Sequence, residues 1–250
     1  KYVPYHKLFE RYDNLTIPGF GDFEGYPNRD SLKYISLYGL DNLDTMVRGT
    51  LRKKGFCDAW NVFVQLGLTD DSYQMEGVDQ MSWLDFMKSF IPHDPRVTPL
   101  EKLASYLHLE NKPDVLEKIE WLGIFNEEPI GLKSGTPAQI LQKRLEEKWL
   151  LHAEDKDMCV MMHLLDYNLH GKKYLCQSSM AVIGENSIHT AMAKTVGLPL
   201  AIATKLVLED KIHQRGVVLP LTPEIYQPIL NELLLRHGIQ FTEIEKTYTI

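Results

Sequence analysis

The sequence has few cysteines and no long apolar run. Its three cysteines are far apart and fit no metal-ligand spacing, so we expect reduced thiols, no metal and a cytoplasmic location. The most apolar stretch, residues 191–208, contains Lys194 and Lys205, so no run reaches the roughly 18 apolar residues of a membrane-spanning helix. No basic-then-apolar signal segment opens the chain. We therefore expect no membrane partner.

Basic residues are also in deficit. The 27 Lys and Arg residues face 34 Asp and Glu residues, which gives a formal net charge of −7. Because a negatively charged surface repels phosphates, a nucleic-acid partner is not expected. The remaining partners are a small molecule or another protein. With 250 residues, the chain can bury one large core or two modest ones.

One stretch lacks acidic residues altogether. No Asp or Glu lies between Thr45 and Cys57, and that interval contains Arg48, Arg52, Lys53 and Lys54. Together with Arg29, it makes residues 25–55 a concentration of cationic side chains. A guanidinium group binds a carboxylate through two parallel hydrogen bonds, so this pattern favours a small molecule with several carboxylates. The alternative is a solvated helix face with ordinary surface charges.

The first third of the chain alternates strand, helix and strand signals. A short strand-like run occupies residues 2–9, and Asp30 or Ser31 is in position to cap a helix that ends at Tyr38. Residues 45–51 are predicted as a strand, in which Gly49 permits a close approach of the backbone. Such a strand places Arg48, Thr50 and Arg52 on one face.

The middle of the chain carries helical signals throughout. Apolar residues recur at helical intervals over residues 56–66, and four further helices are predicted over 83–90, 98–107, 112–122 and 136–150.

The final third returns to strands. Strands are predicted over 157–167, 173–183, 216–219 and 241–250, with a hairpin turn at 169–172. Two helices are predicted between these strands. The first covers 188–208 and is interrupted by Pro199, and the second covers 225–237 and is closed by Gly238.

These signals together predict an α/β fold with two domains. Residues 1–66 and 151–250 form a mixed α/β substrate-binding domain, an α+β mixed sheet with helices on one face. Residues 67–150 form an inserted all-α domain. The G-x-G-x-x-G fingerprint of a dinucleotide site is missing, because the Gly19-x-Gly21 pair is followed by a loop and not by a helix.

Four sequence strings resemble a known family. GYPNRDSLKY, VRGTLRKKGF, MAKTVGLPLAIA and GVVLPLTPEIYQPIL occur in the order found in the saccharopine reductase branch of the saccharopine dehydrogenase family, and the resemblance covers nearly all 250 residues. Members of that family join a Rossmann domain to a glyceraldehyde-3-phosphate dehydrogenase-like C-terminal α/β domain with a helical insertion. The present chain resembles the last two parts, with the N-terminal Rossmann domain absent.

The resemblance implies an oxidoreductase of lysine metabolism. In the family, hydride passes between NADP or NAD and the C–N bond that joins glutamate to aminoadipate semialdehyde, so that saccharopine is formed or cleaved. The substrate is saccharopine or its glutamate and semialdehyde precursors. The nucleotide is bound mainly by the missing domain, so this chain alone is expected to be inactive. The family architecture is compatible with a homodimer.

By the same resemblance, Arg29, Thr50, Leu51 and Arg52 match the saccharopine contacts of the family, with Leu51 contributing backbone. No catalytic residue is identified, since no side chain has the setting of a general acid. One alternative to substrate binding stays open for the arginines, which can form structural salt bridges. Two alternatives stay open for the protein as a whole. It can be a carboxynorspermidine or lysine dehydrogenase-like enzyme, or a non-catalytic homologue that serves as an assembly module.

The roles of the residues next to the predicted site also have two explanations each. Arg48 is either a ligand contact or part of a structural ion pair, and Tyr26 and Asn28 border the pocket only in sequence. Two histidines have simpler explanations: His163 is predicted to be a core residue, and His189 lies near a helix start, where capping or surface roles are expected.

Overall fold

The computed structural model describes residues 2–28 and 30–248 and divides into two compact units. Unit 1 comprises residues 1–16, 22–31 and 46–150, and unit 2 comprises residues 17–21, 32–45 and 151–250. The strands of the described part form two three-stranded sheets, β1-β2-β3 and β4-β5-β6. Every strand pair with a defined register is antiparallel. The domain boundaries at residues 67 and 150 remain a prediction.

Unit 1 begins with a small sheet. A 3-10 helix, Tyr5–Glu10, precedes β1 (Asp13–Ile17) and β2 (Gly21–Pro27), and β2 pairs with β3 (Gly49–Lys53). The first α-helix of this unit, α2 (Phe56–Leu66), follows β3 after a two-residue turn. This connection brings the end of β3 next to the start of α2, which is the region of the candidate site.

The rest of unit 1 is helical, as predicted. A short 3-10 helix, Val78–Gln80, is followed by the four helices α3 (Trp83–Lys88), α4 (Pro99–Tyr106), α5 (Pro113–Trp121) and α6 (Pro137–Lys148). Three of these helices begin with a capping box, in which Ser82, Thr98 and Thr136 each accept a bond from the backbone three residues later. Helices α2 to α6 bury one shared apolar core around Trp83 and Phe86.

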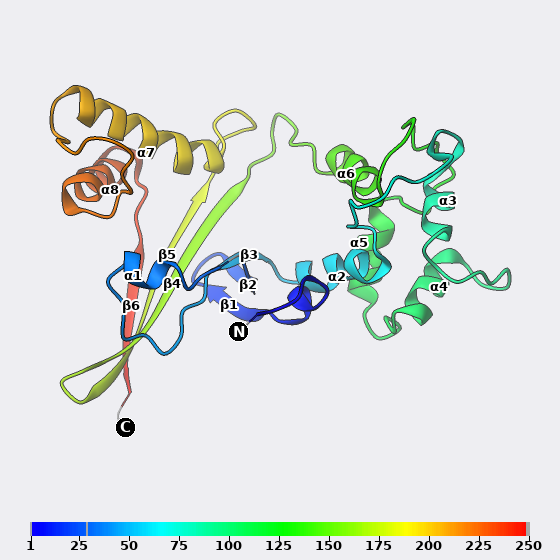
Figure 1. The fold of residues 1–250 in the computed structure, drawn as a ribbon, viewed down its shortest axis with the longest axis horizontal. Helices are drawn as coiled ribbons and strands as arrows, with labels where there is room; N and C mark the ends of the chain where they lie inside the picture. Colours follow the sequence, from blue (N-terminus) through cyan, green and yellow to red (C-terminus); the bar gives the residue numbers. More distant parts are fainter. Residues whose placement is uncertain (1, 29, 249–250) are drawn as a thin grey trace. The chain divides into compact units, whose positions relative to one another are not determined.

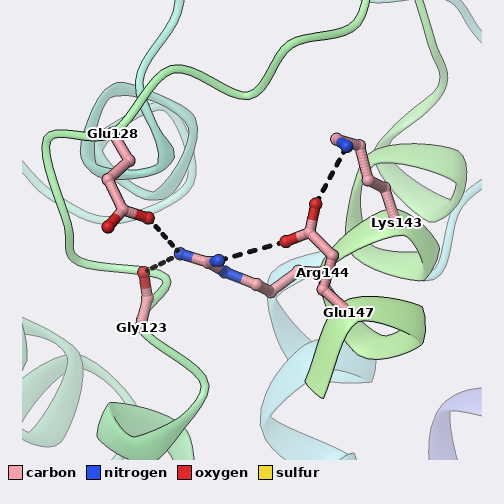
Figure 2. Close-up of polar contacts among 5 residues, drawn as sticks. All are labelled: Gly123, Glu128, Lys143, Arg144 and Glu147. Atoms are coloured by element: carbon pink, nitrogen blue, oxygen red, sulfur yellow. Dashed lines mark hydrogen bonds and ion pairs between the residues drawn. The ribbon is translucent and has the colours of Figure 1, made fainter. Parts of the chain in front are cut away.

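A buried arginine joins α6 to the segment that follows α5 (Figure 2). Arg144 donates a hydrogen bond to the Gly123 carbonyl oxygen at 2.8 Å, and its guanidinium pairs with Glu147 at 3.1 Å and Glu128 at 3.4 Å. The guanidinium carbon also lies 4.6 Å from the ring centroid of Trp83. These contacts compensate a charge that would be costly to bury alone, so Arg144 has a structural role within the helical part of unit 1.

Unit 2 is built on a long hairpin. β4 (Met158–Leu169) and β5 (Lys172–Ile183) pair over their full lengths, and β6 (Thr242–Tyr248) pairs with the other edge of β5. Only His170 and Gly171 connect β4 to β5, with φ values of 51° and 74°. Both residues are therefore left-handed, as a two-residue type I′ hairpin turn requires, and the predicted turn is confirmed.

Two helices cover the end of this sheet that lies away from the hairpin turn (Figure 1). Helix α7 (Ala191–Leu208) packs on α8 (Pro223–His237) and on β4 and β5, with Ile202 and Ile229 in the shared core. A short helix, α1 (Tyr34–Leu37), also belongs to this unit. Within the described residues, α7 alone has the length and apolar composition of a membrane-spanning helix, despite Lys194 and Lys205, and 17% of it is buried.

The mixed α/β class is confirmed, with differences in detail. The strands form two antiparallel sheets and not one mixed sheet. The segment 216–219 is irregular, and residues 5–10 form a 3-10 helix where a strand was expected. Helix α7 runs through Pro199 without a restart. Pattern alone cannot assign a short apolar run to a strand when no neighbouring strand is there to pair with it.

Candidate functional site

The candidate site lies on one face of the β2–β3 pair. In the register of these strands, Thr50 faces Tyr26 and Arg52 faces Glu24. Because side chains alternate along a strand and directly opposed residues share a face, these four side chains lie on the same side of the sheet. Thr50 and Arg52 are thus brought together, as predicted.

The intervening residue, Leu51, points to the opposite face. Its Cδ2 atom lies 3.2 Å from the position that a Cβ atom would occupy on Gly25, so the leucine packs over a glycine of β2. Gly49 at the start of β3 has a different role. A Cβ atom there would lie 2.8 Å from the Tyr26 carbonyl oxygen, so the predicted close approach of the backbone is confirmed and excludes a larger residue.

The loop after β2 is tied to the start of β3. The Asn28 side-chain amide donates to the Thr50 hydroxyl at 2.8 Å, and the Asn28 backbone N–H donates to the Arg48 carbonyl oxygen at 2.9 Å. The backbone N–H of Arg48 in turn donates to the Ser31 hydroxyl at 2.9 Å. Ser31 is therefore engaged with Arg48 and does not cap a helix. Arg29, the remaining predicted contact, lies outside the described residues.

Arg48 differs from Thr50 and Arg52. It precedes the first residue of β3, and its backbone is exposed and bonded to the 28–31 loop. The strand alternation that would align its side chain with Thr50 and Arg52 thus does not extend to it. Asn28, in contrast, contacts Thr50 directly and joins the candidate site in space as well as in sequence.

Arg52 presents an exposed guanidinium beside an aromatic ring. One of its terminal nitrogens donates to the Leu51 carbonyl oxygen at 2.9 Å, and its guanidinium carbon lies 5.6 Å from the ring centroid of Phe56. Arg52 forms no ion pair with any acidic residue in ranges 2–28 and 30–248. A guanidinium without an ion pair has N–H groups that can donate hydrogen bonds to a carboxylate ligand.

Sequence analysis missed Glu24, the acid opposite Arg52. Its side chain is 2% exposed, and its two carboxylate oxygens accept the backbone N–H groups of Gly55 at 2.6 Å and Cys57 at 2.7 Å. Burial, and then the nearby Glu24 carboxylate, raise the pKa of the Cys57 thiol to about 12. The acid-free interval after Thr45 directed attention to the cations, but no sequence signal gave the strand register that places Glu24 among them.

Neither a metal nor a nucleotide fits this site. In the part of the chain that the structure describes, no group of three or more His, Cys, Asp or Glu side chains is arranged to hold a metal ion. The described strands pair antiparallel, and none forms the parallel strand–turn–helix unit with G-x-G-x-x-G that holds a pyrophosphate. Within the described residues, the β2–β3 face therefore lacks the structural unit that binds a dinucleotide.

Both histidines singled out from the sequence are exposed. His163 is exposed on β4 with its ring 5.4 Å from that of Phe241, so its prediction as a core residue was wrong. His189 precedes α7 and is exposed, with its backbone N–H bonded to the Asn186 side chain. Neither lies on the β2–β3 face.

The fold and the site define a mixed α/β protein with a helical part and a strand pair, β2–β3, that carries Arg52 on one face. Comparison with known proteins gives the family. The model of the family described as Saccharopine dehydrogenase C-terminal domain matches residues 1–239. The chain belongs to that family, which confirms the resemblance drawn from the four sequence strings.

Several relatives are similar over most of this chain. Mitochondrial alpha-aminoadipic semialdehyde synthase of Mus musculus is 36% identical over 232 residues, which are 90% of this chain and 24% of that protein. Saccharopine dehydrogenase [NADP(+), L-glutamate-forming] of Pyricularia oryzae is 32% identical over 239 residues, 92% of this chain and 52% of that one. The chain thus spans about half of the fungal relative and a quarter of the mouse relative.

A solved structure is similar as well. Apo histidine-tagged saccharopine dehydrogenase (L-Glu forming) from Saccharomyces cerevisiae is 30% identical, with a TM-score of 0.82 over 97% of this chain and 55% of that chain. The similarity extends over both units. The comparisons do not test which residues contact a ligand, so the roles of Arg29, Thr50, Leu51 and Arg52 remain a prediction.

Proposed function

We propose that this chain is the substrate-binding part of an oxidoreductase that forms or cleaves saccharopine in lysine metabolism. The observation that carries the proposal is the pair Thr50 and Arg52 on one face of β3, with the Arg52 guanidinium unpaired within the described residues. Membership of the saccharopine dehydrogenase C-terminal domain family and the names of the relatives supply the substrate class.

The chemistry of the substrate suits such a site. Saccharopine joins glutamate to the side chain of lysine through a secondary amine and carries three carboxylates. Arg52 would bind one carboxylate through two parallel N–H groups, and Arg29 would bind another in the same way. The Thr50 hydroxyl accepts a bond from Asn28, so its own proton remains to be donated to a ligand oxygen. Leu51 would contribute its backbone.

We propose NADP as the cofactor, held by a part of the protein outside residues 1–250. The NADP(+) in the names of the fungal relatives supports this proposal, as does the length of those relatives beyond the matched half. When bound, the cofactor would supply the hydride acceptor for the C–N bond. The contribution of this chain would be to bind the carboxylates and so orient that bond, which favours reaction through proximity.

Three further proposals concern assembly, location and partners. The fold type supports a homodimer, the widely spaced free cysteines support a cytoplasmic location, and the net charge of −7 argues against nucleic acid as a partner. We propose no membrane partner, because Lys194 and Lys205 interrupt the most apolar stretch. The mouse relative carries the word mitochondrial in its name, so a mitochondrial location is the alternative that cell fractionation would distinguish.

The proposed function is tested with the full-length protein. We expect saccharopine and NADP to give reduced nicotinamide together with glutamate and a semialdehyde, as measured by absorbance and by product analysis. Residues 1–250 alone are expected to be inactive. If the full-length protein forms no reduced nicotinamide from saccharopine with either NADP or NAD, the proposed function is wrong.

A further inference from the structure

Glu24 lies where an ion pair with Arg52 would be expected. The two residues are directly opposed in the antiparallel register of β2 and β3, and opposite charges in such positions normally attract. The Glu24 carboxylate is instead engaged on both oxygens by backbone N–H groups at the start of α2, from Gly55 and Cys57. Glu24 thus compensates the positive end of the helix and not the arginine.

These two bonds also fix the turn that carries Phe56. Gly55 adopts φ of 88°, a left-handed conformation that favours glycine, and it precedes the first residue of α2. Phe56 lies between the two bonded residues, so its backbone is held on both sides. Glu24, thirty-two positions earlier in the chain, therefore fixes the backbone that carries the Phe56 ring.

The Phe56 ring is part of an ordered aromatic row. It is nearly parallel to the ring of Tyr26, with centroids 6.3 Å apart, and to that of Trp60, with centroids 5.6 Å apart. The Arg52 guanidinium rests against this ring through a cation–π contact. Planar guanidinium groups pack well on aromatic rings and keep their in-plane donors available for another partner.

We infer that Glu24 and Phe56 are positioning residues, which hold the Arg52 guanidinium uncompensated and oriented for a carboxylate of the substrate. The inference rests on the proposed function and adds two residues to it. Glu24 places the turn, Phe56 places the guanidinium, and neither contacts the ligand itself. Substitution of Glu24 or Phe56 should therefore weaken substrate binding only in a protein that retains Arg52.

A double-mutant cycle in the full-length protein tests the coupling. Steady-state rates are measured for wild type, Phe56→Leu, Arg52→Ala and the double variant, with saccharopine varied at saturating NADP. Loss of one cation–π contact is expected to raise KM for saccharopine about two- to fivefold in Phe56→Leu. In the Arg52→Ala background the same substitution should change KM by a factor of about one, because coupled residues are not additive. We expect KM for NADP to change little in all three variants.

Two variants of similar size control for stability. Phe63→Leu removes another ring from α2, in the core and edge-to-face with Trp60, and should lower the melting temperature without raising KM. Phe56→Tyr keeps the ring face and should keep KM near the wild-type value. Glu24→Gln, which retains only one acceptor for the two N–H groups, should raise KM in the same coupled manner as Phe56→Leu.

The outcomes distinguish the positioning role of Glu24 and Phe56 from the proposed activity on saccharopine. If wild type oxidises saccharopine but the effects of Phe56→Leu and Arg52→Ala multiply independently, or Phe63→Leu raises KM equally, the inference alone is overturned. If wild type does not act on saccharopine at all, the proposed function fails and the inference falls with it.

Discussion

At the scale of single residues, the Cys57 thiol reports the electrostatic state of the site. Burial is the larger cause of its raised pKa of about 12, and the Glu24 carboxylate adds to it. The same carboxylate caps α2, so changes at Glu24 should be visible at Cys57. Burial in apolar surroundings keeps a thiol in its protonated, less nucleophilic form. The Cys57 thiol is therefore a probe of the neighbouring Glu24 carboxylate.

Removing the charge of Glu24 should lower the pKa of Cys57. In a Cys159→Ser, Cys176→Ser background, the thiolate absorbance of the folded protein should rise near pH 12, and Glu24→Gln should move that rise to lower pH. The shift should be partial because burial persists. Since the folded pKa lies above the ordinary value of 9.0, the thiol stabilises the fold fully below pH 9 and loses that contribution as pH rises towards 12. An unchanged titration in Glu24→Gln would contradict this assignment.

Tyr167 should behave similarly in unit 2. Its hydroxyl donates to the Glu245 carboxylate, and this bond raises the pKa of Tyr167 to about 12. The stabilisation from this bond is expected to be complete below pH 10, the ordinary tyrosine value, and to disappear as pH rises through 12. The pKa of Tyr12 is also raised, chiefly by burial, so tyrosinate absorbance should show a late-titrating fraction that Glu245→Gln reduces but does not abolish. Tyr167→Phe should reduce the late fraction by the same amount, and an unchanged late fraction in that variant would show that another tyrosine is responsible.

At the scale of helices and strands, helix existence and the hairpin turn could be predicted best. The predicted helices over 83–90, 98–107 and 136–150 begin at or next to Ser82, Thr98 and Thr136, which cap them, and His170-Gly171 lies inside the turn predicted at 169–172. Strand pairing could not be predicted. Whether Glu24 opposes Arg52 depends on the register of β2 against β3, which tertiary contacts fix and local pattern does not.

Arg144 provides a test of the helical part of unit 1. Arg144→Met should lower the free energy of unfolding by about 2 kcal/mol, because it removes the bond to the Gly123 carbonyl and the contact with Trp83. Lys143→Met is the matched control on the same helix. It loses only a solvent-exposed pair with Glu147 and should change stability by about 0.5 kcal/mol or less. Chemical denaturation of both variants measures this difference, and equal effects would argue against a structural role for Arg144.

At the scale of the whole molecule, the described residues contain no dinucleotide-binding fold. Family membership follows from residues spread over nearly the entire sequence, which is why the four strings were sufficient to suggest it. The division into units could not be predicted in the same way. Residues 17–21 and 32–45 group with the C-terminal residues, a long-range contact pattern that no local signal carries.

The central claim is that the Thr50–Arg52 face of β3 binds a substrate carboxylate. It is tested most directly by KM for saccharopine in full-length Arg52→Ala, with Lys53→Ala as the matched control. Lys53 is the adjacent cation on the opposite face of β3, with its ammonium 4.6 Å from the ring centroid of Phe23.

Loss of a charged two-bond contact should raise KM roughly ten- to hundredfold in Arg52→Ala. Lys53→Ala should change KM about twofold or less, because an exposed charge that does not touch the ligand is screened by salt. Equal KM values in Arg52→Ala and wild type would contradict the claim, as would equal increases in both variants.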